Sequence, residues 1–152
     1  MIGDDEYFMN FALREAQKGL ESQEVPVGCV IVLDGVVIGR GHNQIESLQD
    51  PTAHAEILAI TAAANYLTSR RLERCTAYVT LEPCAMCCGA LNLARVERLV
   101  FGAYDPKAGA AVTLYKIPTD SRLNHVMEVE GGLLAEECGA ILSEFFRKLR
   151  RK

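Results

Sequence analysis

The chain has 152 residues, of which 49% are hydrophobic and 24% are charged, and its formal net charge at pH 7 is −4. This length and composition are typical of one globular domain, which we expect to span residues 1–152. The acidic balance argues weakly against a nucleic-acid partner. No apolar run is long enough to span a bilayer and the acidic N-terminus shows no export signal, so a cytoplasmic location is expected.

The first half of the chain predicts two helices separated by a β-hairpin. Its expected elements are a helix over residues 4–21, strands over 27–33 and 36–41, and a helix over 53–67. Asp34 and Gly35 join the two strands as the dipeptide typical of a two-residue hairpin. Asp50 can cap the second helix, and Pro51 suits a first turn.

The second half predicts short buried strands that alternate with helices. Its expected elements are strands over 76–81 and 98–103, a weak edge strand over 126–130, and helices over 84–94 and 135–150. Alternation of this kind favours an α/β fold, a three-layer α-β-α sandwich. We expect a mixed, mostly five-stranded sheet that is partly parallel and covered by helices on both faces.

Two short motifs carry the chemistry. His54-Ala55-Glu56 lies at the predicted start of one helix, and Pro83-Cys84-Ala85-Met86-Cys87 follows a buried strand. Structural zinc sites usually use four Cys or His ligands, whereas one His and two Cys would leave a coordination position for water. Zinc lowers the pKa of a bound water towards neutrality. The pattern therefore predicts a hydrolytic zinc catalyst.

The predicted helices favour this site. Cys84 and Cys87 share one helix face, and the positive N-terminal ends of two helices would stabilise their thiolates. On a regular helix Glu56 points about 200° away from His54, so we expect it outside the ligand set, as a proton shuttle beside the bound water. Cys88 is an alternative fourth ligand that would close the site.

The remaining cysteines carry no such pattern. Cys29, Cys75 and Cys138 lie among apolar neighbours, and we expect inert core thiols at all three positions. Because three of the six cysteines fall within five residues, metal ligation in a reducing compartment is favoured over a disulfide framework.

Together these motifs resemble the zinc-dependent nucleoside and nucleobase deaminases, and the chain is most similar to the bacterial tRNA-specific adenosine deaminases. The similarity covers essentially the whole chain. It is carried by residues 24–28, 50–56, 80–87, 101–110, 124–125 and 142–146. The resemblance implies the cytidine deaminase-like fold, one zinc ion per subunit, tRNA as substrate, and a homodimer with the 84–94 helix as a candidate interface.

The resemblance also implies a reaction. His54, Cys84 and Cys87 would hold zinc, and Glu56 would move a proton from the activated water to the base and then to the departing amine. Water would replace the amine at C6 of the wobble adenosine in the anticodon loop, normally of an arginine tRNA, giving inosine and ammonia. Such chemistry requires the base to leave its stack, which a loop nucleotide permits at little cost.

The substrate contacts come from the same resemblance. The base would meet Pro26, Val27, Asn43 and the backbone N–H of Ala55. The flanking anticodon nucleotides would meet Asp105, Lys107, Asn124 and His125, and also Arg147 together with Phe145 or Phe146. Each of these residues has an ordinary structural interpretation as well, and at least one of Phe145 and Phe146 is expected in the core. The basic residues at 147–152 favour RNA contact, although they also complement a helix dipole.

Three other functions share parts of this pattern. A small-substrate deaminase acting on guanine, cytosine or cytidine would use the same zinc residues. A riboflavin-pathway deaminase is less favoured, because no residues are left over for a reductase domain. A zinc-stabilised nucleic-acid-binding module would need a closed four-ligand site and would have no use for Glu56.

Overall fold

The structure is a computed structural model that describes residues 2–151. Met1 and Lys152, the last residue of the basic tail, lie outside the described residues. The elements in chain order are α1 (Ile2–Glu21), β1 (Gly28–Leu33), β2 (Val36–His42), α2 (Ile45–Leu48), α3 (Ala55–Leu67), β3 (Thr76–Leu81), α4 (Ala85–Leu93), β4 (Arg98–Ala103), the 3-10 helix η1 (Ile117–Thr119), β5 (Glu128–Glu130) and α5 (Ala135–Arg150).

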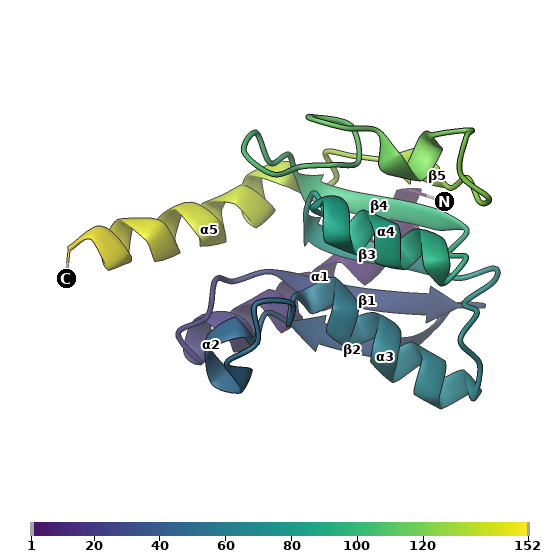
Figure 1. The fold of residues 1–152 in the computed structure, drawn as a ribbon. Helices are drawn as coiled ribbons and strands as arrows, with labels where there is room; N and C mark the ends of the chain where they lie inside the picture. The colour runs from purple at the N-terminus through teal and green to yellow at the C-terminus, as the bar shows by residue number, and fades with distance from the viewer. Residues whose placement is uncertain (1, 152) are drawn as a thin grey trace.

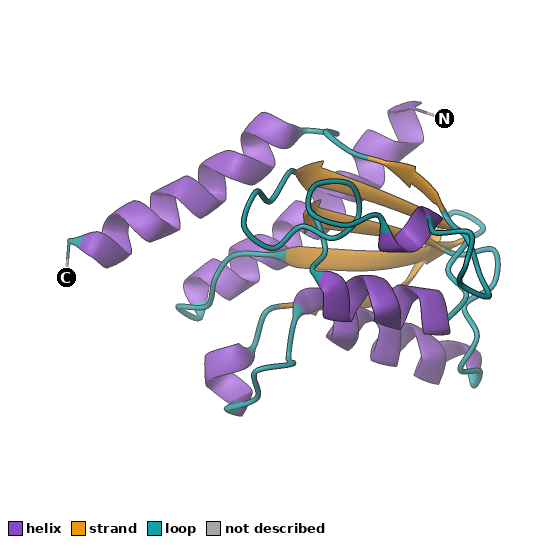
Figure 2. Cartoon of the chain, turned by 45° about the horizontal axis from the view of Figure 1, so that its top comes forward, coloured by secondary structure: helices purple, strands orange, loops and turns teal. Residues whose placement is uncertain are grey.

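One five-stranded sheet in the order β2-β1-β3-β4-β5 forms the middle layer. β1 runs antiparallel to both β2 and β3, whereas β3, β4 and β5 are parallel. Helices α3 and α4 lie side by side over one face, and α1 covers the other (Figures 1 and 2). Helix α5 begins against β4 and then extends away from the sheet. The predicted three-layer fold with a mixed sheet is confirmed.

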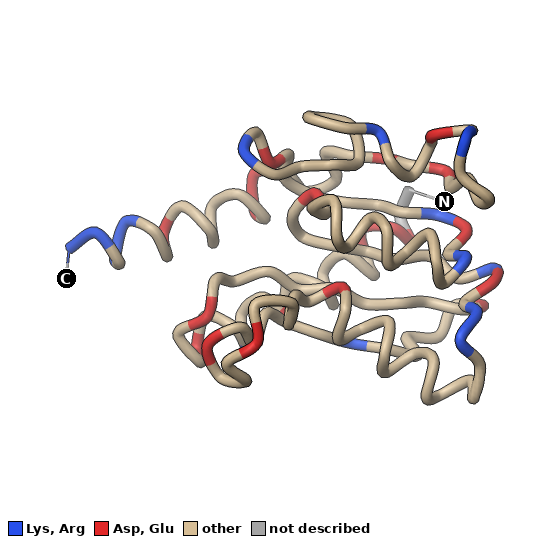
Figure 3. The backbone as a smooth tube through the Cα atoms, viewed as in Figure 1, with Lys and Arg blue, Asp and Glu red and all other residues tan. Residues whose placement is uncertain are grey.

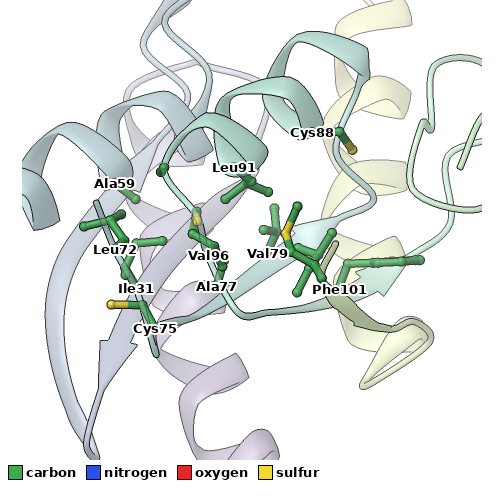
Figure 4. Packing of buried hydrophobic residues seen from close by; sticks show 14 of the residues in the cluster. Ile31, Ala59, Leu72, Cys75, Ala77, Val79, Cys88, Leu91, Val96 and Phe101 are labelled. Atoms are coloured by element: carbon green, nitrogen blue, oxygen red, sulfur yellow. The ribbon is translucent and has the colours of Figure 1, made fainter. Parts of the chain in front are cut away.

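Strand alternation places apolar side chains on both faces of the sheet. In β3, Ala77 and Val79 pack beneath α3 and α4, whereas Tyr78 between them packs towards α1. Figure 4 shows the larger cluster, in which Leu91 of α4 and Phe101 of β4 are fully buried. Because both faces are covered, the central strands are almost continuously apolar, as the sequence predicts for buried strands.

The β1–β2 hairpin is confirmed and sets the position of α3. Asp34 and Gly35 have φ angles of 49° and 77°, the positive pair that a type I′ turn requires. At Gly41 in β2, an added Cβ would overlap the carbonyl oxygen of Ala55 at the start of α3. The absence of a side chain there lets the first turn of α3 lie directly on the strand.

Several expected boundaries are wrong. Helix α3 begins at Ala55, because the Asp50 side chain accepts hydrogen bonds from the N–H (2.8 Å) and hydroxyl (2.7 Å) of Thr52 and so closes a turn before the helix. Helix α4 begins at Ala85, with Cys84 as its N-cap. The edge strand β5 is shorter than expected, and the sequence did not predict α2 or η1.

The three isolated cysteines are core thiols, as predicted. Cys29, Cys75 and Cys138 are fully buried. Burial raises the pKa of Cys75 to about 11 and that of Cys138 to about 12, so these thiols stay protonated at neutral pH. Within residues 2–151, no helix combines the length and apolar character needed to cross a membrane.

Candidate active site

The two motifs meet where α3 and α4 begin. His54 and Cys84 are the N-cap residues of these helices, and both have extended backbones, with φ and ψ of −76° and 153° for His54 and −75° and 176° for Cys84. His54 was expected inside the helix. Because it precedes the first helical residue, the regular-helix angle between His54 and Glu56 does not apply. Glu56 lies in the first turn of α3 and is only 4% exposed.

The expected metal ligands lie close together. His54 Nδ1 is 3.7 Å from the Cys84 sulfur and 3.5 Å from the Cys87 sulfur, and all three ligand atoms lie within 4.8 Å of one another. A tetrahedral zinc ion bonded at about 2.3 Å to sulfur and about 2.1 Å to nitrogen separates these atoms by about 3.6 Å. The two distances from His54 Nδ1 to the sulfur atoms therefore match the spacing that zinc requires.

Cys88 does not join this set. Its thiol points to the carbonyl oxygen of Pro83, at 3.6 Å, and its side chain packs in the core beneath α4 (Figure 4). Within the described residues, the metal-binding group comprises one His and two Cys. The site accordingly has the three protein ligands of a catalytic zinc centre. Cys88 is not available as the fourth ligand that a structural zinc site would need.

The ligands also have the electrostatics that a cation requires. Hydrogen bonds from Cys87 and then His54 lower the pKa of Cys84 to about 3. The interaction with Cys84 raises the pKa values of both Cys87 and His54 in turn. The first thiolate is therefore present at neutral pH, and a bound cation would take the place of the shared proton. Both helix N-termini add positive potential at this point.

Glu56 is a buried carboxyl beside the ligands. Burial raises its pKa to about 7, although a backbone hydrogen bond and the charge of His54 act in the opposite direction. A carboxyl that gains and loses its proton near neutral pH is suited to general acid–base chemistry. The arrangement can hold a metal ion, polarise a water molecule and move protons.

A pocket of about 160 Å³ opens over this centre. Its walls come from the β1 and β2 ends, the start of α3, the β3–α4 junction and the loop after β4. They comprise Val25, Val27, Asn43, Ile45, His54, Glu56, Leu81, Glu82, Cys84, Asp105 and Ala108. This volume is below the usual range of drug-sized ligand sites, about 300–1,000 Å³, and suits one ring system rather than a whole nucleotide.

The expected base contacts are only partly in this pocket. Val27 and Asn43 line it, whereas Pro26 is buried and is not among the lining residues. The expectation for Ala55 needs correction, because its N–H donates to Asn43 Oδ1 at 2.8 Å. This hydrogen bond orients the Asn43 amide, whose Nδ2 group is left as the donor.

Comparison with known proteins agrees with this geometry. The model of the cytidine and deoxycytidylate deaminase zinc-binding region matches residues 2–103. The tRNA-specific adenosine deaminase of Bacillus subtilis (strain 168) is 52% identical, over 97% of this chain and 92% of that protein. The chain belongs to the tRNA-specific adenosine deaminase family.

Solved structures agree with the family and with the fold. One comes from studies of A-to-I editing by tRNA:A34 deaminases at the wobble position of transfer RNA. It is 45% identical, has a TM-score of 0.86, and the match covers 90% of this chain and 99% of that one. A guanine deaminase from Nitrosomonas europaea is 24% identical with a TM-score of 0.81, over 92% of this chain and 83% of that one, and shows the fold alone.

A wider groove adjoins the pocket of this deaminase. It has a volume of about 500 Å³ and shares Val25, Leu81 and Asp105 with the pocket. Lys107 of the loop after β4 and Phe146 of α5 form its outer walls. Lys107 therefore lies beside the neighbouring groove and not over the reacting centre.

The remaining expected RNA contacts lie elsewhere in the deaminase. His125 donates from Nε2 to the Val96 carbonyl oxygen (2.6 Å), and its own carbonyl oxygen accepts from Asn92 (2.6 Å), at the end of α4 opposite Cys84. Asn124 precedes it and is exposed. In this chain, His125 therefore has a structural contact.

The structure distinguishes the two aromatic residues on α5, Phe145 and Phe146, and corrects the expectation that at least one lies in the core. Phe145 lies against Leu20 and Gln23 at the end of α1, and Phe146 is the one that faces the groove. Neither ring belongs to the core, because Phe145 is half-buried and Phe146 is 41% exposed. Arg147 is exposed on the same helix. The expected stacking residue is therefore Phe146 on geometry.

Two buried glutamates, Glu24 and Glu82, hold the segments that line the pocket, a role that no sequence motif predicted. Glu24 accepts hydrogen bonds from the N–H of Glu46 (3.1 Å) and from the N–H and hydroxyl of Ser47 (2.7 and 2.6 Å), which holds the segment beside Ile45. Glu82 holds the loop after β4 in the same manner. Burial alone would raise the pKa of each carboxyl, but the hydrogen bonds outweigh burial and lower both values.

Proposed function

We propose that this protein is a zinc-dependent hydrolase that converts the wobble adenosine of an arginine tRNA to inosine and releases ammonia. The observation that carries the proposal is the set of His54, Cys84 and Cys87, spaced for zinc and left one ligand short, with the buried Glu56 beside it. Sequence identity of 52% to a tRNA-specific adenosine deaminase supports adenosine as the base.

The residues divide the chemistry between them. When bound, one zinc ion per chain supplies the Lewis acid that makes a water molecule acidic near neutral pH. Glu56, with a pKa of about 7, takes up the proton of that water. It then gives this proton to the ring nitrogen beside C6, and afterwards carries the second proton, from the hydroxyl added at C6, to the amine that leaves as ammonia. The overall change adds water and releases ammonia, so no redox partner is needed.

The small pocket accounts for the selection of a single base. Val27 and Ile45 supply apolar walls, and the oriented amide of Asn43 supplies a hydrogen-bond donor. A base that enters must leave its stack, which costs least in a single-stranded loop. The anticodon loop meets this requirement.

RNA outside the pocket would follow the adjoining groove and α5. Phe146 presents an exposed ring and Lys107 a cation at the groove. Figure 3 shows the basic residues gathered at the far end of α5, although the chain as a whole carries a net charge of −4. Such a local cluster can neutralise phosphates despite an acidic average.

The assembly is proposed to be a homodimer in the cytoplasm, where tRNA is found, with each chain acting as a single deaminase domain. Helix α4 supports this, because Met86 and Leu93 are 37% and 77% exposed although both are apolar. A Leu93→Glu variant should shift the sedimentation coefficient to that of a monomer. A wild-type protein that sediments as a monomer would contradict the dimer.

The decisive experiment compares substrates. We expect inosine at the wobble position of an arginine tRNA transcript, and no ammonia from free guanine or cytidine assayed in parallel. Ammonia from a free base without change to the tRNA would contradict the RNA substrate and indicate a small-substrate deaminase. Failure on every substrate by zinc-loaded protein would contradict the enzymatic proposal as a whole.

A further inference from the structure

The loop between β4 and η1 forms one wall of the pocket and of the adjoining groove. Asp105 lines both spaces and Ala108 lines the pocket, so the position of this loop decides the width of each. The loop has no regular secondary structure between Ala103 and Ile117. Something other than a helix or sheet must therefore hold it.

The main anchor of the loop is one carboxylate. Glu82, 2% exposed, accepts five hydrogen bonds from the loop. Oε1 accepts from the Asp105 N–H (3.1 Å) and the Thr113 hydroxyl (2.6 Å). Oε2 accepts from the N–H groups of Ala111 (3.2 Å), Val112 (2.9 Å) and Thr113 (3.0 Å). Both ends of the loop are therefore tied to a single side chain.

Packing in the loop is adapted to this carboxylate. At Gly109, an added Cβ would overlap both Cδ and Oε1 of Glu82, so the loop backbone lies directly on the carboxylate. The Ala110 N–H also donates to the carbonyl oxygen of Pro83 at 2.9 Å, beside the ligand Cys84. The loop is consequently positioned relative to the β3–α4 junction that carries the metal ligand.

We propose that Glu82 is a positioning residue that fixes the 105–113 loop, and through Asp105 and Ala108 sets how substrate fits the pocket and groove. Glu82 is not one of the three residues that could bind the metal, and its carboxylate oxygens are occupied by the loop donors. The catalytic groups lie at the starts of α3 and α4, which pack on the core, so Glu82 governs substrate fit rather than the chemical step. The choice of tRNA as substrate rests on the proposed function. The five hydrogen bonds between Glu82 and the loop, called the clamp below, do not depend on it.

The test compares zinc-loaded wild-type protein with Glu82→Gln. An amide keeps the size of the side chain but sets an NH₂ group against some of the N–H donors. Because hydrogen bonds to a charged group are stronger than those to a neutral one, we expect amide hydrogen exchange across residues 105–113 to rise about tenfold or more. The KM for an arginine tRNA transcript should rise about tenfold, with kcat changed less than KM and zinc content unchanged.

Two further variants approach the clamp from the loop side. Thr113→Val removes one hydroxyl donor and should raise the loop amide exchange and the KM by less than Glu82→Gln does. Gly109→Ala forces a methyl group against the carboxylate and should raise both by more. Glu128→Gln, on the exposed edge strand β5, is the matched control and should change none of them. Thr113→Val also keeps the test decisive if Glu82→Gln does not fold.

The outcomes separate the possible roles. A merely structural role would lower the Tm and leave the KM of the folded protein unaltered, which would overturn the proposal. Loss of zinc from Glu82→Gln would overturn it as well, since Glu82 would then support Cys84. If wild-type protein does not act on tRNA, the proposed function fails, and the exchange of the loop amides still confirms or refutes the clamp.

Discussion

Two glutamates that line one pocket differ in the direction in which their pKa values are shifted. Glu56, at the start of α3, and Glu82, at the end of β3, are 4% and 2% exposed. Burial raises the pKa of Glu56 to about 7, whereas the pKa of Glu82 is lowered despite its burial. Two causes act together, because Glu56 is the more deeply desolvated carboxyl, and Glu82 accepts hydrogen bonds from N–H and hydroxyl groups of a loop.

The comparison shows how one residue type acquires two roles in one site. A buried carboxyl with few donors exchanges its proton near neutral pH and can carry it between water and substrate. A buried carboxyl with many donors stays ionised and acts as a fixed anchor. Glu24 repeats the second arrangement on the opposite wall, where it binds Glu46 and Ser47.

Removal of the metal should have the largest effect, because it should abolish turnover and leave the loop held by Glu82 unchanged. Chelation of zinc is expected to reduce turnover to background, because the Lewis acid held by His54, Cys84 and Cys87 is removed. Hydrogen exchange across the 105–113 loop should stay close to that of the loaded protein, since Glu82 holds it. Turnover should return when zinc is added back. Full activity in metal-free protein would contradict the metal site.

Substitution of Glu56, the proton carrier, should have the next largest effect on activity. Glu56→Gln should lower kcat by about 10²-fold or more, because general acid–base catalysis typically contributes that much. Metal analysis should find zinc still bound, and the KM should change little. If zinc is lost together with activity, Glu56 helps to hold the metal, and its role as a proton shuttle is wrong.

Asp5 is a further buried carboxylate, and it lies outside the pocket. Arg98 donates to both of its oxygens (2.7 and 2.6 Å), Tyr78 donates to Oδ1 (2.6 Å), and the pKa of Asp5 is lowered mainly by Arg98. A lowered pKa in the folded state adds stability above the ordinary value of 3.8, and that stability is lost as the pH falls through the lower, folded-state value.

Asp5→Asn should therefore reduce the free energy of unfolding at pH 7 by about 1–3 kcal/mol, the usual effect of losing a buried charged partner. Urea unfolding of metal-free wild-type and variant proteins at pH 7 and at pH 3 would measure it. The gap should narrow as the pH falls below 3.8, because the unfolded chain then takes up a proton at Asp5 more readily than the folded protein does. A gap that stays constant would show that the charge is not responsible.

The smallest effect is expected on the exposed tail. Arg147→Gln combined with Lys148→Gln should weaken tRNA binding a few-fold. The dependence of log Kd on log salt should fall by about one for each phosphate that the tail no longer neutralises. Glu56→Gln should leave this salt dependence unaltered. An unchanged slope in the tail variant would mean that these cations do not meet the RNA.

The regular parts of the fold could be predicted because their signals are local. The apolar runs at 76–81 and 98–103 and the helical period at 135–150 give β3, β4 and α5 their observed bounds. The start of α3 could not be placed in this way. Asp50 suits a helix cap and a turn equally well, and the turn with Thr52 prevails.

The site could be predicted where spacing carries the chemistry, and not where a long-range interaction does. The motifs predict that His54, Cys84 and Cys87 come together, as they do. The role of Glu82 depends on N–H groups 23 to 31 residues further along the chain, which no local pattern reveals. A charged residue directly after an apolar strand is the one sequence signal that it gives.

Gly41 links the hairpin to the reacting centre. Since β2 has no side chain at this point, the first turn of α3 rests on the strand backbone itself, and the depth of Glu56 below the pocket is set by backbone thickness. Even a methyl group there would lift the helix end and move the proton carrier. Gly41 takes no part in the reaction, yet it determines the position of the Glu56 carboxyl in the pocket. Any redesign of the hairpin would have to keep this glycine.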